Sequence, residues 1–122
     1  MRLWHYRLLT VLPRQQLLGQ HRECCALRGR GWGKKHATVN YVFDHSPRLL
    51  FQYHLQVIGE MERRGYHCDP LWKQPLYRGK IADPWAFLPA CEESVYPEHT
   101  DAYLQACLDN LQDKGIFLKL PE

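Results

Sequence analysis

The sequence of 122 residues lacks any apolar run close to the roughly 18–20 residues that span a bilayer. Its start, MRLWHYRLL, also lacks the apolar core and small-residue cleavage site of a signal peptide. We therefore expect a soluble, cytoplasmic protein. Hydrophobic residues make up 45% and charged residues 24%, which are globular proportions that argue against disorder. The length fits one compact domain over residues 1–122.

Motifs for disulfides and metals are missing as well. The five cysteines are an odd number and form no C-x-x-C pair, which argues against a disulfide framework and a Cys-rich zinc site. No H-x-x-x-H or H-E-x-x-H pair occurs, so a metal site would need partners distant in sequence. We expect no metal and no cofactor, with the thiols and imidazoles serving packing and hydrogen bonding. The seven histidines are His5, His21, His36, His45, His54, His67 and His99.

One nucleotide-binding motif and one hydrolase motif are also absent from the sequence. There is no G-x-x-x-x-G-K-[ST] phosphate loop and no G-x-S-x-G nucleophile elbow. The segment GRGWGKK, residues 29–35, shares only its glycines and lysines with a phosphate loop. It is still able to contact backbone phosphates through Arg30, Lys34 and Lys35, with Trp32 available to stack on a base.

The charge is distributed unevenly along the chain. Residues 1–35 hold eight Lys or Arg against one acid, whereas residues 36–122 hold eight against twelve, and the sum is the net charge of +3. A basic block of this kind indicates a polyanionic partner, most often nucleic acid. A solvated basic face without a partner is the alternative.

Hydrophobic spacing predicts an all-α domain of three main helices, over about residues 13–27, 47–64 and 101–114. Proline at the first turn suits the first two helices, and Ser46 and Thr100 are suitable N-caps. The predicted buried stripes are Leu17, Leu18, His21, Cys24 and Cys25, then Leu50, Tyr53, His54, Val57, Ile58 and Met61, then Leu104, Cys107, Leu108 and Leu111. Glu60 and Arg64 are expected to pair across one turn. The long segment from Tyr66 to His99 has five prolines, and we expect it to wrap the helices through Trp72 and Trp85.

Glu23 is the single acid of the basic block and follows Arg22 directly. A strongly positive field favours the carboxylate, so its pKa is expected to fall. Such an anion works against phosphate binding, but it suits a site where positive charge develops on a sugar, as in glycosidic bond cleavage. The alternative is a surface carboxylate paired with Arg28 or Lys34, which contributes about 0–1 kcal/mol.

The run LLTVLPRQQLLGQHRECCALRG resembles the first helix of the pyrimidine-dimer DNA glycosylases, the family typified by phage endonuclease V. Gln15, Leu17 and the Arg22-Glu23 pair match, and His36 opens a segment leading to a helix that ends in ERRGY. YPEHTDAYLQACLDNLQDK is similar in position to the family's last helix. The resemblance is strongest in the first helix and faint over residues 67–95. It implies an all-α fold of three helices.

The resemblance also implies a chemistry and a set of site residues. The α-amine of Met1 would attack the anomeric carbon of a damaged nucleotide in duplex DNA, form a Schiff base and cleave the strand by β-elimination, without metal or cofactor. Glu23 would stabilise positive charge and move protons, next to Arg22 as a catalytic neighbour. The protein would act as a monomer on DNA carrying a damaged base or an abasic site, and be nucleoid-associated when bound. The implied DNA-binding residues are Arg2, Gln15, Arg22, Arg28, Arg30, Lys34, Lys35 and His36.

Three departures from the family pattern leave the lesion and the activity open. Ala26 stands where the family has an arginine, and the sequence ends in FLKLPE rather than in an aromatic tail. Met1, which is expected to be retained before Arg2, stands where the phage enzyme has its terminal threonine. A non-catalytic nucleic-acid-binding protein on the same scaffold is therefore one alternative, and a helical protein without affinity for DNA is another.

Overall fold

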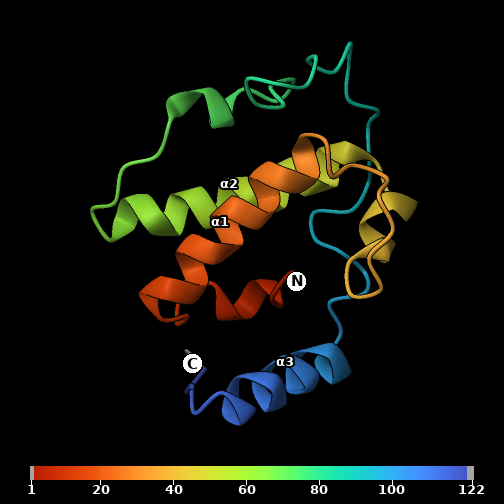
Figure 1. Ribbon diagram of the computed structural model, residues 1–122. Helices are drawn as coiled ribbons and strands as arrows, with labels where there is room; N and C mark the ends of the chain where they lie inside the picture. The colour runs from red at the N-terminus through yellow and green to blue at the C-terminus, as the bar shows by residue number, and fades with distance from the viewer. Residues whose placement is uncertain (1, 121–122) are drawn as a thin grey trace.

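The computed structural model describes residues 2–120 and is built from three α-helices (Figure 1). They are α1 (Arg14–Arg28), α2 (Pro47–Arg63) and α3 (Asp101–Asp113). Short 3₁₀ turns occur at Tyr6–Leu8, Asn40–Asp44 and Pro70–Lys73, and residues 2–120 contain no strand. The predicted all-α class and its three helices are therefore confirmed. None of the helices in this part of the chain is long and apolar enough to cross a membrane.

Local sequence explains where the helices begin and end. The Ser46 hydroxyl accepts a hydrogen bond from the Arg48 N–H, and the Thr100 hydroxyl accepts one from the Tyr103 N–H, as expected of N-caps. Gly115 follows α3 with a φ of +81°, a left-handed conformation that glycine adopts without strain. In α1 the helix starts one residue later than predicted, since Pro13 occupies the cap position.

One hydrophobic core joins all three helices to the N-terminal segment. The predicted stripe of α2 is buried throughout, and α1 crosses α2 in Figure 1. The stripe of α1 differs, because Leu18, His21 and Cys25 are only half-buried, while the polar Gln20 and Arg28 are buried. Hydrophobic periodicity assigns polar side chains to the surface. It did not predict the burial of these two, because each forms hydrogen bonds to the backbone of a segment distant in sequence.

Gln20 ties the N-terminal segment to α1. Its Oε1 accepts hydrogen bonds from the Trp4 N–H at 2.7 Å and the Tyr53 hydroxyl at 3.0 Å, and its Nε2 donates to the Arg2 carbonyl at 3.1 Å. The Tyr53 hydroxyl shares its single hydrogen between Gln20 and the Trp4 carbonyl, which lies at 2.6 Å, and the Tyr103 hydroxyl of α3 donates to the Leu3 carbonyl. Residues 2–4 are thereby fixed between α1 and α3 (Figure 1).

The long segment before α3 is attached to the C-terminal end of α1 by two arginines. Arg28 donates to the carbonyls of Trp72, Gln74 and Tyr77 at 2.7–2.8 Å. In return, Arg78 donates to the carbonyls of Arg28 and Gly29, and its guanidinium lies 3.9 Å from the centre of the Trp85 ring. The tryptophans do anchor this segment: Trp72 packs against Arg28 and the His54 ring, and Trp85 packs against Arg78 and the Trp32 ring.

Three histidines are buried among residues 2–120, and two of them, His54 and His99, make the fold most sensitive to acid. Burial lowers the pKa of His54 to about 2 and that of His99 to about 3, from an ordinary value of 6.5. Both are therefore neutral in the folded protein, whereas the unfolded chain takes up a proton on each below pH 6.5. The contribution of each histidine to stability is complete well above pH 6.5 and is lost as the pH falls, with a slope that approaches about 1.4 kcal/mol per pH unit well below that pH.

We expect the free energy of unfolding by urea to fall by about 2 kcal/mol between pH 6.5 and 5.5 for this pair, since each unfolded imidazole is already half protonated at pH 6.5. Burial also raises the pKa of Glu23, so this one group makes the folded protein more stable as the pH falls and partly offsets the loss from the histidines. Replacing the exposed His67 by Asn should leave the slope unchanged. A free energy of unfolding that stays level over this interval would contradict the assignment of two neutral buried imidazoles.

Candidate active site

Three separate parts of the chain enclose a polar cavity of about 310 Å³. The N-terminal segment, one face of α1 and the last turns of α3 form most of its wall. Its lining residues are Arg2, Trp4, Gln16, Gly19, Gln20, Glu23, Thr38, Asn110 and Lys114. Glu23 supplies the only carboxylate among them, so any acid–base or charge-stabilising chemistry in this cavity would depend on it.

The environment of Glu23 differs from the sequence-based expectation. Its pKa is raised above the ordinary value, since burial disfavours the carboxylate more than the N-terminal ammonium and His36 favour it. The expected fall in pKa is therefore wrong, because burial of the carboxyl group outweighs the positive charges near it. Arg28 is engaged with the long segment, and Lys34 is exposed. A raised pKa lies nearer to neutral pH than that of an ordinary carboxyl group, and this favours a role in proton transfer.

Glu23 is also left without a structural partner. None of the ion pairs among residues 2–120 involves it, so the alternative of a pair with Arg28 or Lys34 finds no support. Its Oε1 is buried and accepts no hydrogen bond from the described residues, as is the case for Oδ1 of Asn110 on the same cavity. Native structures pair nearly all buried polar atoms, and the exceptions often mark a functional site.

The structure brings only some of the expected site residues to this cavity. Arg2 and Glu23 line it, whereas Gln15 and Arg22 are exposed on α1, where the Arg22 guanidinium extends beside Gly19. The neighbouring Gln16, which the sequence reading passed over, lines the cavity instead of Gln15. Met1 lies outside the described residues.

The other expected DNA contacts fall into two groups. Lys34, Lys35 and His36 are exposed in the loop after α1, and the His36 ring bonds to the hydroxyl of Thr38 at 3.2 Å. Arg30 is exposed too, but it lines a second cavity of about 290 Å³ with residues of the long segment. The basic loop therefore borders the Glu23 cavity through Thr38.

Arg28 does not belong to either group, and its expected role in DNA contact needs correction. It is 2% exposed, and its two terminal nitrogens donate to three carbonyls and to the His54 ring. A guanidinium so enclosed has no donors directed to solvent for a phosphate. We assign it to holding the long segment against α1.

Sequence reasoning also missed the part of the site that α3 supplies. Asn110 and Lys114 are four residues apart and so share one helix face. The Lys114 ammonium lies 5.2 Å from the centre of the Trp4 ring, with the Arg2 guanidinium 6.0 Å from the same ring. The four-residue spacing of Asn110 and Lys114 predicts that they share one face of α3. The sequence of α3 does not predict that this face lines the same cavity as Glu23.

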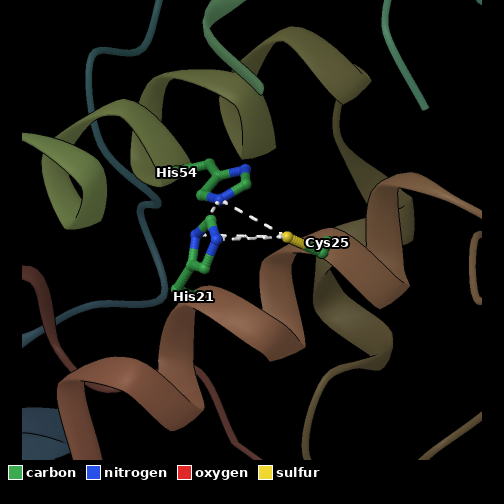
Figure 2. A group of neighbouring side chains, drawn as sticks. All are labelled: His21, Cys25 and His54. Carbon is green, nitrogen blue, oxygen red and sulfur yellow. Dashed lines mark hydrogen bonds between the residues drawn. The ribbon is translucent and has the colours of Figure 1, made fainter. Parts of the chain in front are cut away.

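A second cluster of reactive side chains lies between α1 and α2 (Figure 2). The ring nitrogens of His21 and His54 and the Cys25 sulfur lie within 4.8 Å of one another, as the donor atoms of a metal site would. His54 is the kind of distant partner that the sequence could not reveal. In Figure 2 Nε2 of His54 points toward the His21 ring, with Cys25 one turn along α1 from His21.

Hydrogen-bond directions in this cluster oppose metal binding. A guanidinium only donates, so the Arg28 contact at 2.9 Å makes Nδ1 of His54 the acceptor. The neutral ring then carries its hydrogen on Nε2 and donates to Nδ1 of His21 at 2.9 Å. His54 thus offers no lone pair to a metal, whereas metal-binding histidines normally donate from their second nitrogen. The cluster is a directed chain of hydrogen bonds joining α1 to α2.

Comparison with known proteins identifies the family to which this chain belongs. The family model described as pyrimidine dimer DNA glycosylase matches residues 1–74, which include Arg22, Glu23 and the basic loop. No curated protein and no solved structure matches the chain. The protein is accordingly a DNA repair enzyme of the glycosylase and lyase class, acting on damaged DNA. It belongs to the pyrimidine dimer DNA glycosylase family.

Proposed function

We propose that the protein cleaves the glycosidic bond of damaged pyrimidines in duplex DNA and then nicks the strand as an abasic-site lyase, acting as a monomer. The nucleophile is the α-amine of Met1. An α-amine has an ordinary pKa of about 7.7–8, so a useful fraction is neutral near pH 7, unlike a lysine amine. Its attack on the anomeric carbon forms a C–N bond, and the base leaves with a proton.

The observation that carries this proposal is the shared position of Arg2 and Glu23. Both line the same cavity, and the Arg2 carbonyl is fixed by Gln20 at 3.1 Å. Consecutive Cα atoms are about 3.8 Å apart, so the amine of the preceding residue is within one residue's reach of that wall. A nucleophilic amine and a carboxyl group are the two groups that this chemistry requires.

Glu23 acts on the sugar in this scheme. As a carboxylate it stabilises the positive charge that develops when the base departs and when the iminium forms. As an acid it donates a proton to the ring oxygen when the sugar opens, and as a base it removes the C2′ proton, whereupon the C3′–O bond breaks. A pKa raised by burial supports the proton steps, because it lessens the free-energy preference for the carboxylate over the acid.

Exposed cations around the cavity mouth and the loop bind the phosphates. Arg22, Arg30, Lys34 and Lys35 are exposed and contact the DNA backbone together with Arg2, Gln15 and His36. Extrusion of the damaged nucleotide into the cavity costs a few kcal/mol, which these contacts offset.

Borohydride trapping on a duplex with one abasic site tests the proposal. We expect a covalent adduct that peptide mass spectrometry places on the N-terminal peptide, at the α-amine. A protein whose α-amine has been acetylated is the matched control and should give no adduct, with unchanged affinity for the duplex. Binding without an adduct from the native protein would instead identify a non-catalytic DNA-binding protein.

A further inference from the structure

The segment between Leu76 and Trp85 forms a closed loop with an exposed apolar side chain at its tip. The Trp85 N–H donates to the Leu76 carbonyl at 2.9 Å, so the two ends of this 76–85 loop lie together. Ile81, halfway between them, is 70% exposed. Covering an apolar side chain that lies this far in water is favourable. The loop also lies beyond residues 1–74, the part of the chain that the family match covers.

Contacts with the end of α1 and with the rest of the long segment hold the 76–85 loop in place. Arg78 donates to the carbonyls of Arg28 and Gly29 at 2.8 and 2.9 Å. Gly79 turns the chain with a φ of +94°, and the Trp72 ring lies 3.4 Å from the point where a Cβ at this position would be. The tip is therefore held on a fixed frame, and a partner that binds it does not first have to order the loop.

The tip of the loop lines the second cavity, which adjoins the Glu23 cavity along α1. Ile81 and Ala26 both line the second cavity, whereas Glu23 lines the first. Glu23 and Ala26 are three residues apart on α1, and side chains at this spacing are neighbours, about 5–6 Å apart. Nucleotides follow one another at about 3.4 Å along a strand of B-DNA. A duplex that extends from Glu23 along α1 therefore meets the loop within its first few base pairs.

Cations surround the tip, and among residues 2–120 no carboxylate lines the second cavity. Its charged lining residues are Arg30, Arg78 and Lys80. Arg30 and Lys80 are exposed, and none of the ion pairs within the described chain involves either of them. Arg30 also joins this group to the exposed Lys34 and Lys35 of the basic loop. An apolar side chain among exposed cations is the pattern of proteins that enter the minor groove of DNA.

We propose that the 76–85 loop is a second DNA contact, in which Ile81 enters the minor groove beside the lesion while Arg30 and Lys80 bind the flanking phosphates. The inference rests on the proposed function, because it takes the face of α1 that carries Glu23 as the one that meets DNA. The minor groove is about 6 Å wide, so it admits one such side chain but not a helix. Insertion of Ile81 at a base step bends the duplex, and the bend brings more phosphates to the exposed cations.

Binding to a duplex that carries one tetrahydrofuran abasic analogue, which a lyase does not cleave, tests this contact. Ile81→Ser should weaken the affinity by about 10-fold, because an apolar contact is lost, and should leave the slope of log K against log salt unchanged. Lys80→Ala should lower that slope by about one. Leu71→Ser is the matched control, since Leu71 is 46% exposed on the same long segment but does not line the cavity. It should change neither the affinity nor the slope.

Insertion of Ile81 has a separate signal in 2-aminopurine, a base analogue whose fluorescence rises when it is unstacked. Placed in turn at the base pairs next to the abasic analogue, it should brighten at one position with the native chain but not with Ile81→Ser. The inference is overturned if Ile81→Ser keeps its affinity within twofold, if its complexes brighten like the native ones, or if Lys80→Ala keeps the native salt slope. A dimer in sedimentation that Ile81→Ser dissociates would also overturn it, by assigning the tip to a second copy of the chain.

The outcome separates this contact from the proposed chemistry. A native protein that gives the borohydride adduct, with an Ile81→Ser variant that binds unchanged, would reject the contact and keep the chemistry. Weakened binding by Ile81→Ser and a reduced salt slope for Lys80→Ala, in a protein that gives no adduct, would support the contact and reject the chemistry.

Discussion

Glu23→Gln is expected to lower the single-turnover lyase rate by about 100-fold or more, the range that a positioned acid–base group contributes. Glutamine keeps the shape and one oxygen, but it neither balances an iminium charge nor moves a proton. Affinity for the abasic duplex should be equal or tighter, because a negative charge near the phosphates is removed. The measurement is the pre-steady-state rate of strand cleavage with enzyme in excess.

The same substitution should not destabilise the fold. Burial raises the pKa of Glu23 above its unfolded value, so ionisation of this group costs stability at neutral pH. Glutamine removes that cost, and the gain should vanish at a pH low enough to protonate the unfolded carboxyl group. Glu92→Gln, which removes the same charge from an exposed position, controls for net charge. If the Glu23→Gln rate equals that of the Glu92→Gln variant, the catalytic role of Glu23 is wrong.

Arg28→Met is expected to reduce the free energy of unfolding by about 3 kcal/mol or more. The carbonyls of Trp72, Gln74 and Tyr77 would lose the donors that satisfy them, at about 1–3 kcal/mol for each group that stays buried. Nδ1 of His54 would lose its donor as well. Urea unfolding of the whole chain measures the effect.

Arg30→Met provides the comparison for Arg28, since Arg30 is exposed two residues further on. Its stability should stay within about 0.5 kcal/mol of the native protein, as surface substitutions usually do. DNA binding should show the opposite pattern at a temperature where both variants are folded. The slope of log K against log salt should fall by about one for Arg30→Met and not for Arg28→Met. A reduced slope for Arg28→Met would restore it as a phosphate contact.

Comparing the predicted with the observed environment of individual residues shows which inferences a sequence supports. The α2 stripe and the caps of α2 and α3 were predicted correctly, because a helix buries one face and ends by rules that act within a few residues. The ion pair of Glu60 with Arg64 is confirmed at 2.8 Å for the same reason, and Arg63 joins it. The fate of Arg28 and the pKa of Glu23 were predicted wrongly, since both depend on segments tens of residues away.

The sequence by itself determined the helical class, the helix limits to within about a residue, the basic first third of the chain and the lone acid in it. It also contained the family resemblance, because the matching residues lie in one continuous stretch, the first helix, and can be compared without a three-dimensional structure. Only the tertiary structure decided which of the many polar side chains meet. It buried Arg28, raised the pKa of Glu23, and brought Asn110 and Lys114 from α3 to the cavity beside Arg2. Burial and proximity are properties of packed segments, and no local pattern encodes them.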